Sequence, residues 1–149
     1  MRIAHTKHLL VAAALAASTA ATAGNPEPRR FCSDSLVRGT YAGQLQGKVR
    51  LPDGTTAAEI IGVVIRLYDG QGGVVQWDSV KNSASGYVPN RYGTGTYRVN
   101  DDCTLDVEFQ PSPTTKIVER AVIVDEGREL RSITVDPPTL WVTSVQQRI

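Results

Sequence analysis

The chain carries two cysteines, Cys32 and Cys103, and their chemistry depends on whether they pair. They lie far apart in the sequence, unlike the Cys-x-x-Cys spacing of redox-active pairs. Two thiols without other ligands also make a poor zinc site. In an exported chain, two cysteines most often form a structural disulfide. We therefore predict a disulfide between Cys32 and Cys103, which on the chain-entropy account would stabilise the fold by about 4 kcal/mol.

Proton transfer would have to come from carboxylates, because the only histidines, His5 and His8, lie in an N-terminal segment with the features of a cleaved signal. Without them the chain lacks the usual general base near neutral pH and the commonest transition-metal ligand. Glu119 or Asp78 could serve an isomerase or cyclase if it faced the interior and apolar neighbours held it protonated or poised. We expect both to face outwards, and we predict no catalytic residue, metal or cofactor.

Four aromatic residues suggest binding rather than catalysis. Tyr41, Tyr97 and Phe109 occupy the apolar faces of alternating segments, and Trp77 lies in another such segment. Together they are our candidates for the lining of a pocket that takes a small apolar ligand. The alternative is that they fill a solid core, which would leave a structural or interaction module. We expect a binding protein, with an isomerase or cyclase as the alternative.

Residues 1–23 have the three parts of an export signal. Arg2 and Lys7 stand near the start, the apolar run of residues 9–17 follows, and the small residues 21–23 form a cleavage site. The apolar run is far shorter than the roughly 20 residues that a membrane-spanning helix needs. The segment therefore predicts export to the periplasm or the extracellular space, without a membrane span.

We predict cleavage after Ala23, with Ala20 as the alternative. Residues 24–31 contain two prolines and have the character of a disordered leader. The remaining residues, 32–149, are one domain's worth of chain and enough to bury a single core.

The charge balance gives little indication of a charged partner. The chain has 16 Lys and Arg residues and 15 Asp and Glu residues, and removing the signal with Arg2 and Lys7 leaves a formal charge of minus one. No basic run is present. The composition therefore gives no electrostatic reason to expect nucleic acid or an anionic membrane surface as a partner.

Eight segments have the alternation or the continuous apolar character of β-strands. They are residues 41–51, 59–68, 74–80, 96–100, 105–109, 116–124, 128–135 and 140–145. Short polar turns join most of them, and the longest segment expected to be irregular is 82–92, which contains Tyr87 and Tyr92. Residues 33–38 begin with capping residues and end before Gly39, which predicts a single helical turn.

Eight sequential strands joined by hairpins predict an all-β fold. We expect an eight-stranded antiparallel up-and-down barrel with a short N-terminal helical turn covering one end. Closure of the sheet would remove both edges, and a barrel of this size is either filled by side chains or holds one small ligand. A two-sheet β-sandwich is the alternative.

Several short motifs carry a family resemblance. They are Cys32, Leu36-Val-Arg-Gly-Thr-Tyr41, Asp69-Gly-Gln-Gly72, Gly95-Thr-Tyr-Arg-Val-Asn-Asp-Asp-Cys-Thr104 and the closing Asp136-Pro. With them, most of the mature chain resembles a family of small exported bacterial and fungal proteins of unassigned function. The family's cysteine is commonly followed by Thr-Gly-Thr, whereas Thr104-Leu-Asp106 follows Cys103 here. The implied fold is similar to lipocalin-like calycin and allene oxide cyclase barrels, but no catalytic motif of those barrels matches this chain.

Overall fold

The computed structural model describes residues 32–149, so the predicted signal peptide (1–23) and leader (24–31) lie outside the described residues. The described elements, in chain order, are η1 (Asp34–Val37), β1 (Gly39–Arg50), β2 (Thr56–Tyr68), β3 (Gly73–Asn82), β4 (Gly86–Val99), β5 (Thr104–Ser112), β6 (Thr115–Val124), η2 (Asp125–Gly127), β7 (Glu129–Asp136) and β8 (Leu140–Arg148). Both η elements are short 3-10 turns. No helix in the described range is long and apolar enough to cross a membrane.

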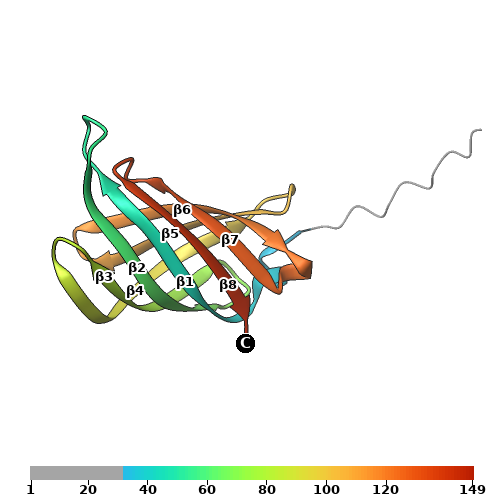
Figure 1. Cartoon of the computed structure of the whole chain (residues 1–149). Helices are drawn as coiled ribbons and strands as arrows, with labels where there is room; N and C mark the ends of the chain where they lie inside the picture. Colours follow the sequence, from blue (N-terminus) through green and yellow to red (C-terminus); the bar gives the residue numbers. More distant parts are fainter. Residues whose placement is uncertain (1–31) are drawn as a thin grey trace, which may run out of the picture.

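The strands form a closed barrel in the order of the sequence, and each strand is antiparallel to its neighbours (Figure 1). Closure comes from the pairing of β1 with β8, which runs from Tyr41 opposite Arg148 to Val49 opposite Leu140. This architecture confirms the predicted up-and-down barrel and rules out the sandwich, because neither β1 nor β8 is a free edge.

Two inward-facing glycines of β1 allow this closure. A Cβ atom at Gly43 would lie 2.1 Å from the carbonyl oxygen of Val145, and one at Gly47 would lie 2.0 Å from that of Trp141. No side chain fits at such distances, so only glycine lets the backbones of β1 and β8 approach closely here. The inward face of β1 therefore has two roles: its glycines allow closure with β8, and its larger residues contribute to the core.

The N-terminal plug, residues 32–38, covers one end of the barrel (Figure 1). Its Val37 side chain is fully buried in a cluster with Tyr41, Tyr68 and Tyr97. The rings of Tyr41 and Tyr97 each meet Tyr68 edge to face, at centroid distances of 5.4 and 5.0 Å. Such contacts add to the hydrophobic stabilisation of burying the rings. The predicted helical turn is thus confirmed, and it seals a tightly packed half of the barrel.

Hydrogen bonds fix the plug to two strands of the barrel, β4 and β8, and Arg148 of β8 also binds Tyr41 of β1. The Tyr97 hydroxyl donates to the Asp34 carbonyl oxygen at 3.0 Å, and the Val99 amide donates to the Asp34 carboxylate at 2.7 Å. The Arg148 guanidinium donates to the Leu36 carbonyl at 2.5 Å and to the Tyr41 hydroxyl at 2.7 Å. These contacts satisfy polar groups that the plug would otherwise bury unpaired.

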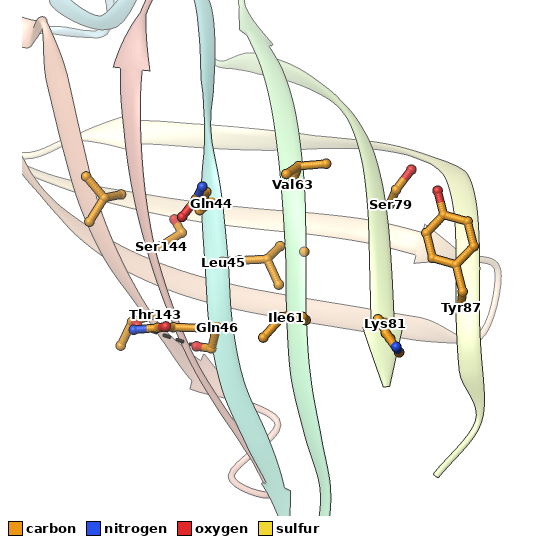
Figure 2. A pocket seen from close by; sticks show the side chains of 12 residues that line it. Gln44, Leu45, Gln46, Ile61, Val63, Ser79, Lys81, Tyr87, Thr143 and Ser144 are labelled. Carbon is orange, nitrogen blue, oxygen red and sulfur yellow. Dashed lines mark hydrogen bonds between the residues drawn. The ribbon is translucent and has the colours of Figure 1, made fainter. Parts of the chain in front are cut away.

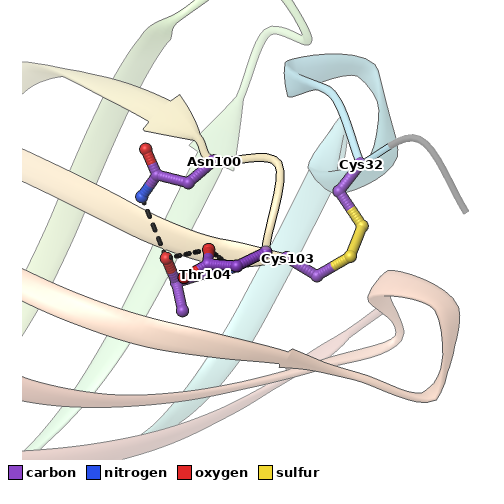
Figure 3. Close-up of a disulfide and its surroundings, with 5 residues drawn as sticks. Cys32, Asn100, Cys103 and Thr104 are labelled. Atoms are coloured by element: carbon purple, nitrogen blue, oxygen red, sulfur yellow. Dashed lines mark hydrogen bonds between the residues drawn. A yellow bond between two sulfur atoms is a disulfide. The ribbon is translucent and has the colours of Figure 1, made fainter. Parts of the chain in front are cut away.

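The disulfide between Cys32 and Cys103 is present, which confirms the predicted pairing (Figure 3). It joins the plug to the turn between β4 and β5, across a sequence separation of 71 residues. Cys103 has a positive φ of 62°, and its amide donates to the Asn100 carbonyl at 2.9 Å. The turn that the Asn and Asp residues form therefore presents Cys103 to the plug.

The prediction of an irregular segment at residues 82–92 is wrong, because β4 begins at Gly86. Pro89 breaks the strand pattern in the sequence, since it has no amide hydrogen to donate. In the barrel, Pro89 and Asn90 are left out of the β3–β4 ladder, where Val80 pairs with Val88 and Asp78 with Arg91. This bulge accommodates the proline within β4, which pairs with β3 both before and after it.

Replacing both cysteines by serine tests the role of the disulfide. We expect the free energy of unfolding to fall by about 4 kcal/mol, because the unfolded chain loses a long covalent loop. The far-UV circular dichroism of the strands should not change, since the ladders do not involve the sulfur atoms. Urea denaturation measures the effect. Reductant should lower the stability of the wild type to that of the variant, and equal stability of the oxidised wild type and the variant would contradict the prediction.

Candidate functional site

A cavity of about 150 Å³ lies inside the barrel, on the side away from the plug. Its position follows from the hairpins that border it, because Asn82 ends β3, Ser85 lies in the turn between β3 and β4, and Leu140 begins β8. The apolar part of its wall consists of Leu45, Ile60, Val80, Val88, Phe109, Ile117, Leu140 and Val142. This apolar part is mainly aliphatic, with one aromatic ring, and Asn82, Ser85 and Thr134 add uncharged polar groups to the lining.

An ion pair forms the floor of this cavity. Arg66 on β2 donates to both oxygens of Glu119 on β6, at 2.8 Å from Nη1 and 2.7 Å from Nη2. In the closed barrel, β2 and β6 are four strands apart and lie on opposite walls, so the pair crosses the interior. The guanidinium also lies 5.5 Å from the centroid of the Phe109 ring. This pair separates the cavity from the packed tyrosines near the plug.

Polar side chains extend the floor along β3 and β4. Gln76, the cross-strand partner of Arg66, accepts from Arg66 Nε at 2.5 Å and donates to Asp78 at 2.5 Å. Arg91 then donates from Nε to the other Asp78 oxygen at 2.6 Å. Inward-facing residues of adjacent strands thus form one continuous chain of hydrogen bonds, in which each charged group has an opposite partner.

On the other side, Glu119 is bound by hydroxyl groups. Ser132 of β7 donates to Glu119 at 3.0 Å and lies 2.8 Å from the Ser144 hydroxyl of β8, which in turn accepts from Gln146 at 2.8 Å. Two buried polar atoms, Tyr68 Oη and Gln146 Oε1, have no hydrogen-bond partner among the described residues. The polar layer therefore continues below the cavity floor into the tyrosine cluster.

The electrostatics of the layer keep Glu119 ionised. Burial alone would raise the pKa of this carboxyl group, but the Arg66 guanidinium and the Ser132 hydroxyl bond outweigh it and hold the pKa below its usual value. Burial likewise opposes the charge of Arg66, and Glu119 outweighs it so that the pKa of the guanidinium is raised. Burial raises the pKa of Tyr68, which keeps its hydroxyl protonated. The floor is therefore an ionised pair beside a neutral phenol.

Of the four predicted aromatic pocket residues, Phe109 lines the cavity. Tyr41 and Tyr97 lie in the packed cluster near the plug, below the polar layer. Trp77 lies on the outer face of the barrel, 44% exposed, with its ring 5.6 Å from that of Tyr92. Strand alternation explains Trp77, because its neighbours Gln76 and Asp78 are the inward-facing residues of β3.

Both candidate carboxylates face the interior, so the expectation that Glu119 and Asp78 point outwards is wrong. Neither is surrounded by apolar groups alone, since each accepts hydrogen bonds from an arginine. In the sequence, each charged residue lies two positions from an apolar residue that is buried: Arg66 from Val64, Asp78 from Val80, and Glu119 from Ala121. The same alternation is equally compatible with a hydrated outer face, because the sequence does not show which residues are partners across the barrel.

A second hollow, a groove of about 610 Å³, lies on the outside of β8, β1, β2 and β3 (Figure 2). Gln44 and Gln46 of β1 line it beside Ile61 and Val63 of β2, and Tyr87 borders it. The groove belongs to a wider outer apolar face, in which every member is between 42% and 65% exposed. This face consists of Ile61, Val63, Ile65, Leu67, Trp77, Tyr87, Tyr92 and Val145.

The opposite side of the barrel is charged. Cross-strand and neighbouring ion pairs cover β5 to β7, and each partner in the following pairs is at least partly exposed. They are Lys116–Glu108, Arg120–Asp106 and Arg131–Glu129. Pairs of this kind contribute little stability but keep a surface hydrated. The wall over β5 to β7 thus combines ion pairs with exposed apolar residues such as Val122, Ile133 and Val135.

Among residues 32–149, no group of three or more His, Cys, Asp and Glu side chains could hold a metal ion. The polar layer contains two carboxylates, but each is directed at an arginine. Its chemistry is that of hydrogen bonding and charge pairing.

Comparison with known proteins gives distant structural similarities only. The S-type phycobiliprotein lyase CPES from Guillardia theta is 8% identical, with 78% of this chain and 90% of that chain covered and a TM-score of 0.41. Rv2717c from M. tuberculosis is 16% identical, with 77% and 94% covered and a TM-score of 0.37. No protein-family model and no curated protein matches the chain. The family resemblance of the motifs stays a prediction, and the fold assignment depends on the strand pairing itself.

The ion pair predicts a difference in acid stability between Glu119→Gln and the wild type. The folded-state pKa of Glu119 is below its unfolded value of about 4.3, so its contribution is complete above that pH and is lost as the pH falls through the folded pKa. At pH 7 the variant leaves the Arg66 charge unpaired, and we expect a loss of about 3 to 5 kcal/mol. Denaturation between pH 7 and 3 should show this difference shrinking with acid.

Glu108→Gln is the matched control, because Glu108 pairs with Lys116 on the surface and both are about half exposed. This change should cost about 1 kcal/mol or less. Equal losses in the two variants, or a difference that grows with acid, would contradict a stabilising buried pair.

Proposed function

We propose that the protein is an exported carrier that binds a small, mainly apolar ligand in the barrel cavity. The observation that supports this function is the cavity of about 150 Å³ with an aliphatic wall and a hydrogen-bonded floor. Ligand sites are typically concave, mostly apolar and provided with a few polar groups that orient the ligand. The sealed, disulfide-bonded plug at one end leaves the hairpin end as the side from which a ligand would enter.

The polar layer favours a carrier over an isomerase or cyclase. A general acid or base must gain and lose a proton near the working pH. Glu119 is fixed by two hydrogen bonds from Arg66, and its pKa is lowered, so it stays ionised at neutral pH. Asp78 is 1% exposed and bound by Gln76 and Arg91, which leaves its oxygens occupied. Both carboxylates therefore hold arginines in place.

The outer apolar face favours a second function, that of an interaction module that binds another copy of the same chain. Its eight large side chains are each 42% to 65% exposed and form an apolar patch of the kind that marks interaction sites. The groove in this face has the amides of Gln44 and Gln46 and the hydroxyls of Ser79 and Thr143, with Lys81 as its one charged lining residue. Symmetric dimers that use the same patch on both subunits are the commonest assemblies.

Two matched tryptophan variants test the carrier function. Val142→Trp would fill the cavity from β8, whereas Val145→Trp on the same strand would add the ring to the outer groove. With hexan-1-ol as a neutral probe, NMR shift changes in the wild type should centre on cavity residues such as Phe109 and Thr134. Val142→Trp should weaken binding at least tenfold through lost volume, and Val145→Trp should not. Shift changes confined to the outer groove would overturn the proposal.

Two aspartate variants test self-association. Val63→Asp introduces a charge into the outer apolar face, and Val122→Asp is the control on the charged side, where the valine is similarly exposed. Sedimentation velocity should show a dimer for the wild type and for Val122→Asp, and a monomer for Val63→Asp. A wild type that stays monomeric at sub-millimolar concentration would contradict the interaction function.

A further inference from the structure

Arg91 is the arginine of the cavity whose hydrogen-bonding capacity is least used. It lines the cavity, its side chain is 32% exposed, and it binds Asp78 through Nε at 2.6 Å. Its two amino groups, Nη1 and Nη2, make no hydrogen bond with any residue in the described part of the chain. A guanidinium has five N–H donors in a planar fork, so the end of this fork remains open.

The bulge in β4 places Arg91 at this point. Pro89 and Asn90 together oppose Ser79, and Asn90 has a positive φ of 49° while its amide donates to the Ser79 hydroxyl at 3.1 Å. Bulges redirect side chains and are common beside functional sites. Here the bulge brings Arg91 opposite Asp78 and into the cavity lining, whereas the next residue, Tyr92, lies on the outer face.

The acceptors of the floor, in contrast, are occupied. Both Glu119 oxygens accept from Arg66, and one also accepts from Ser132. The Asp78 oxygens accept from Gln76 and Arg91. The carboxylates are thus already engaged, whereas the amino groups of Arg91 are not, so the strongest uncommitted group is a charged donor. Asn82, Ser85 and Thr134 add only uncharged polar groups to the lining. A ligand's polar end should therefore be an oxygen acceptor with two oxygens that fit the fork of a guanidinium.

We infer that the cavity selects small amphiphilic carboxylic acids, with the carboxylate bound by the amino groups of Arg91 and the hydrocarbon part against the aliphatic wall. This inference rests on the proposed carrier function. Asp78 holds the Nε edge of Arg91 and so orients the fork, but its negative charge also opposes an acidic ligand. The charges of the two arginines and the two carboxylates of the floor sum to zero, so the cavity has no excess positive charge to attract an acid. Because Asp78 lies next to Arg91, its charge is the one that limits affinity for the acid.

Three probes of matched chain length distinguish the possible ligand classes: hexanoate, hexan-1-ol and hexylamine. Their dissociation constants at pH 7 can be measured with the oxidised wild-type protein by NMR titration. We expect hexanoate to bind about tenfold more tightly than hexan-1-ol, since two charge-assisted hydrogen bonds replace one neutral bond. Hexylamine should bind most weakly, because the most exposed charged group of the cavity is the Arg91 guanidinium, which repels a cation.

Two variants test Arg91 itself. Asp78→Asn removes the opposing charge and keeps one oxygen as an acceptor for Arg91 Nε, while its new amide group faces the Gln76 amide. It should tighten the binding of hexanoate several-fold relative to that of hexan-1-ol. The double variant Arg91→Gln/Asp78→Asn removes both charges without leaving either unpaired, and it should abolish the preference for the acid. Unchanged strand signal in circular dichroism confirms that each variant is folded.

The outcomes separate this inference from the carrier function. Equal binding of hexanoate and hexan-1-ol in the cavity, or the tightest binding by hexylamine, would overturn the acid preference and leave the carrier function standing. A preference for the acid that persists in the double variant would also overturn the role of Arg91. Absence of binding by all three probes would overturn both proposals.

Discussion

The ion pair between Arg66 and Glu119 is the interaction on which the barrel interior depends. It joins opposite walls, and both residues are almost fully buried. Taking two charges out of water is costly, and the cost is offset only when geometry is good and the remaining hydrogen-bonding groups are satisfied. Here two direct bonds, with Gln76 and Ser132 as further partners, meet that condition. Removing one member would leave an unpaired charge, so we expect the residues of the layer to depend on one another for stability.

The pair also divides the interior into two halves with different packing. On the plug side, Val37 and three tyrosines fill the space between the walls. On the other side the arginine side chains occupy the middle of the barrel, and the residues facing them leave about 150 Å³ unfilled. An eight-stranded barrel has room for either a filled core or one small ligand, and this protein has part of each. The cavity is therefore bounded by polar groups that are already fixed in position before any ligand arrives.

Closure of the sheet restricts how the protein can contact others. Each strand pairs with both neighbours over at least part of its length, and the only stretch of β4 without a β5 partner among the described residues is 86–93. Most contacts must therefore use side chains on the outer wall or groups within the cavity. The outer wall includes ion pairs on β5 to β7 and the outer apolar face, and large apolar patches are characteristic of interaction sites. The two proposed functions thus use opposite faces of the same strands, and neither needs to interfere with the other.

The sequence by itself determined the strand alternation, the helical turn and the cysteine pair, because these depend on local periodicity, capping and the scarcity of other partners for a thiol. It therefore predicted the barrel and the disulfide correctly. It missed the start of β4, since a strand containing Pro89 is recognisable only when its bulge is seen against β3. It also could not assign Trp77 and Glu119 to opposite sides of the wall. Alternation separates two faces of a strand but does not say which is inside when a buried charge is paired by residues far away in sequence. Only the tertiary structure decided that, by bringing Arg66 of β2 to Glu119 of β6 across the interior.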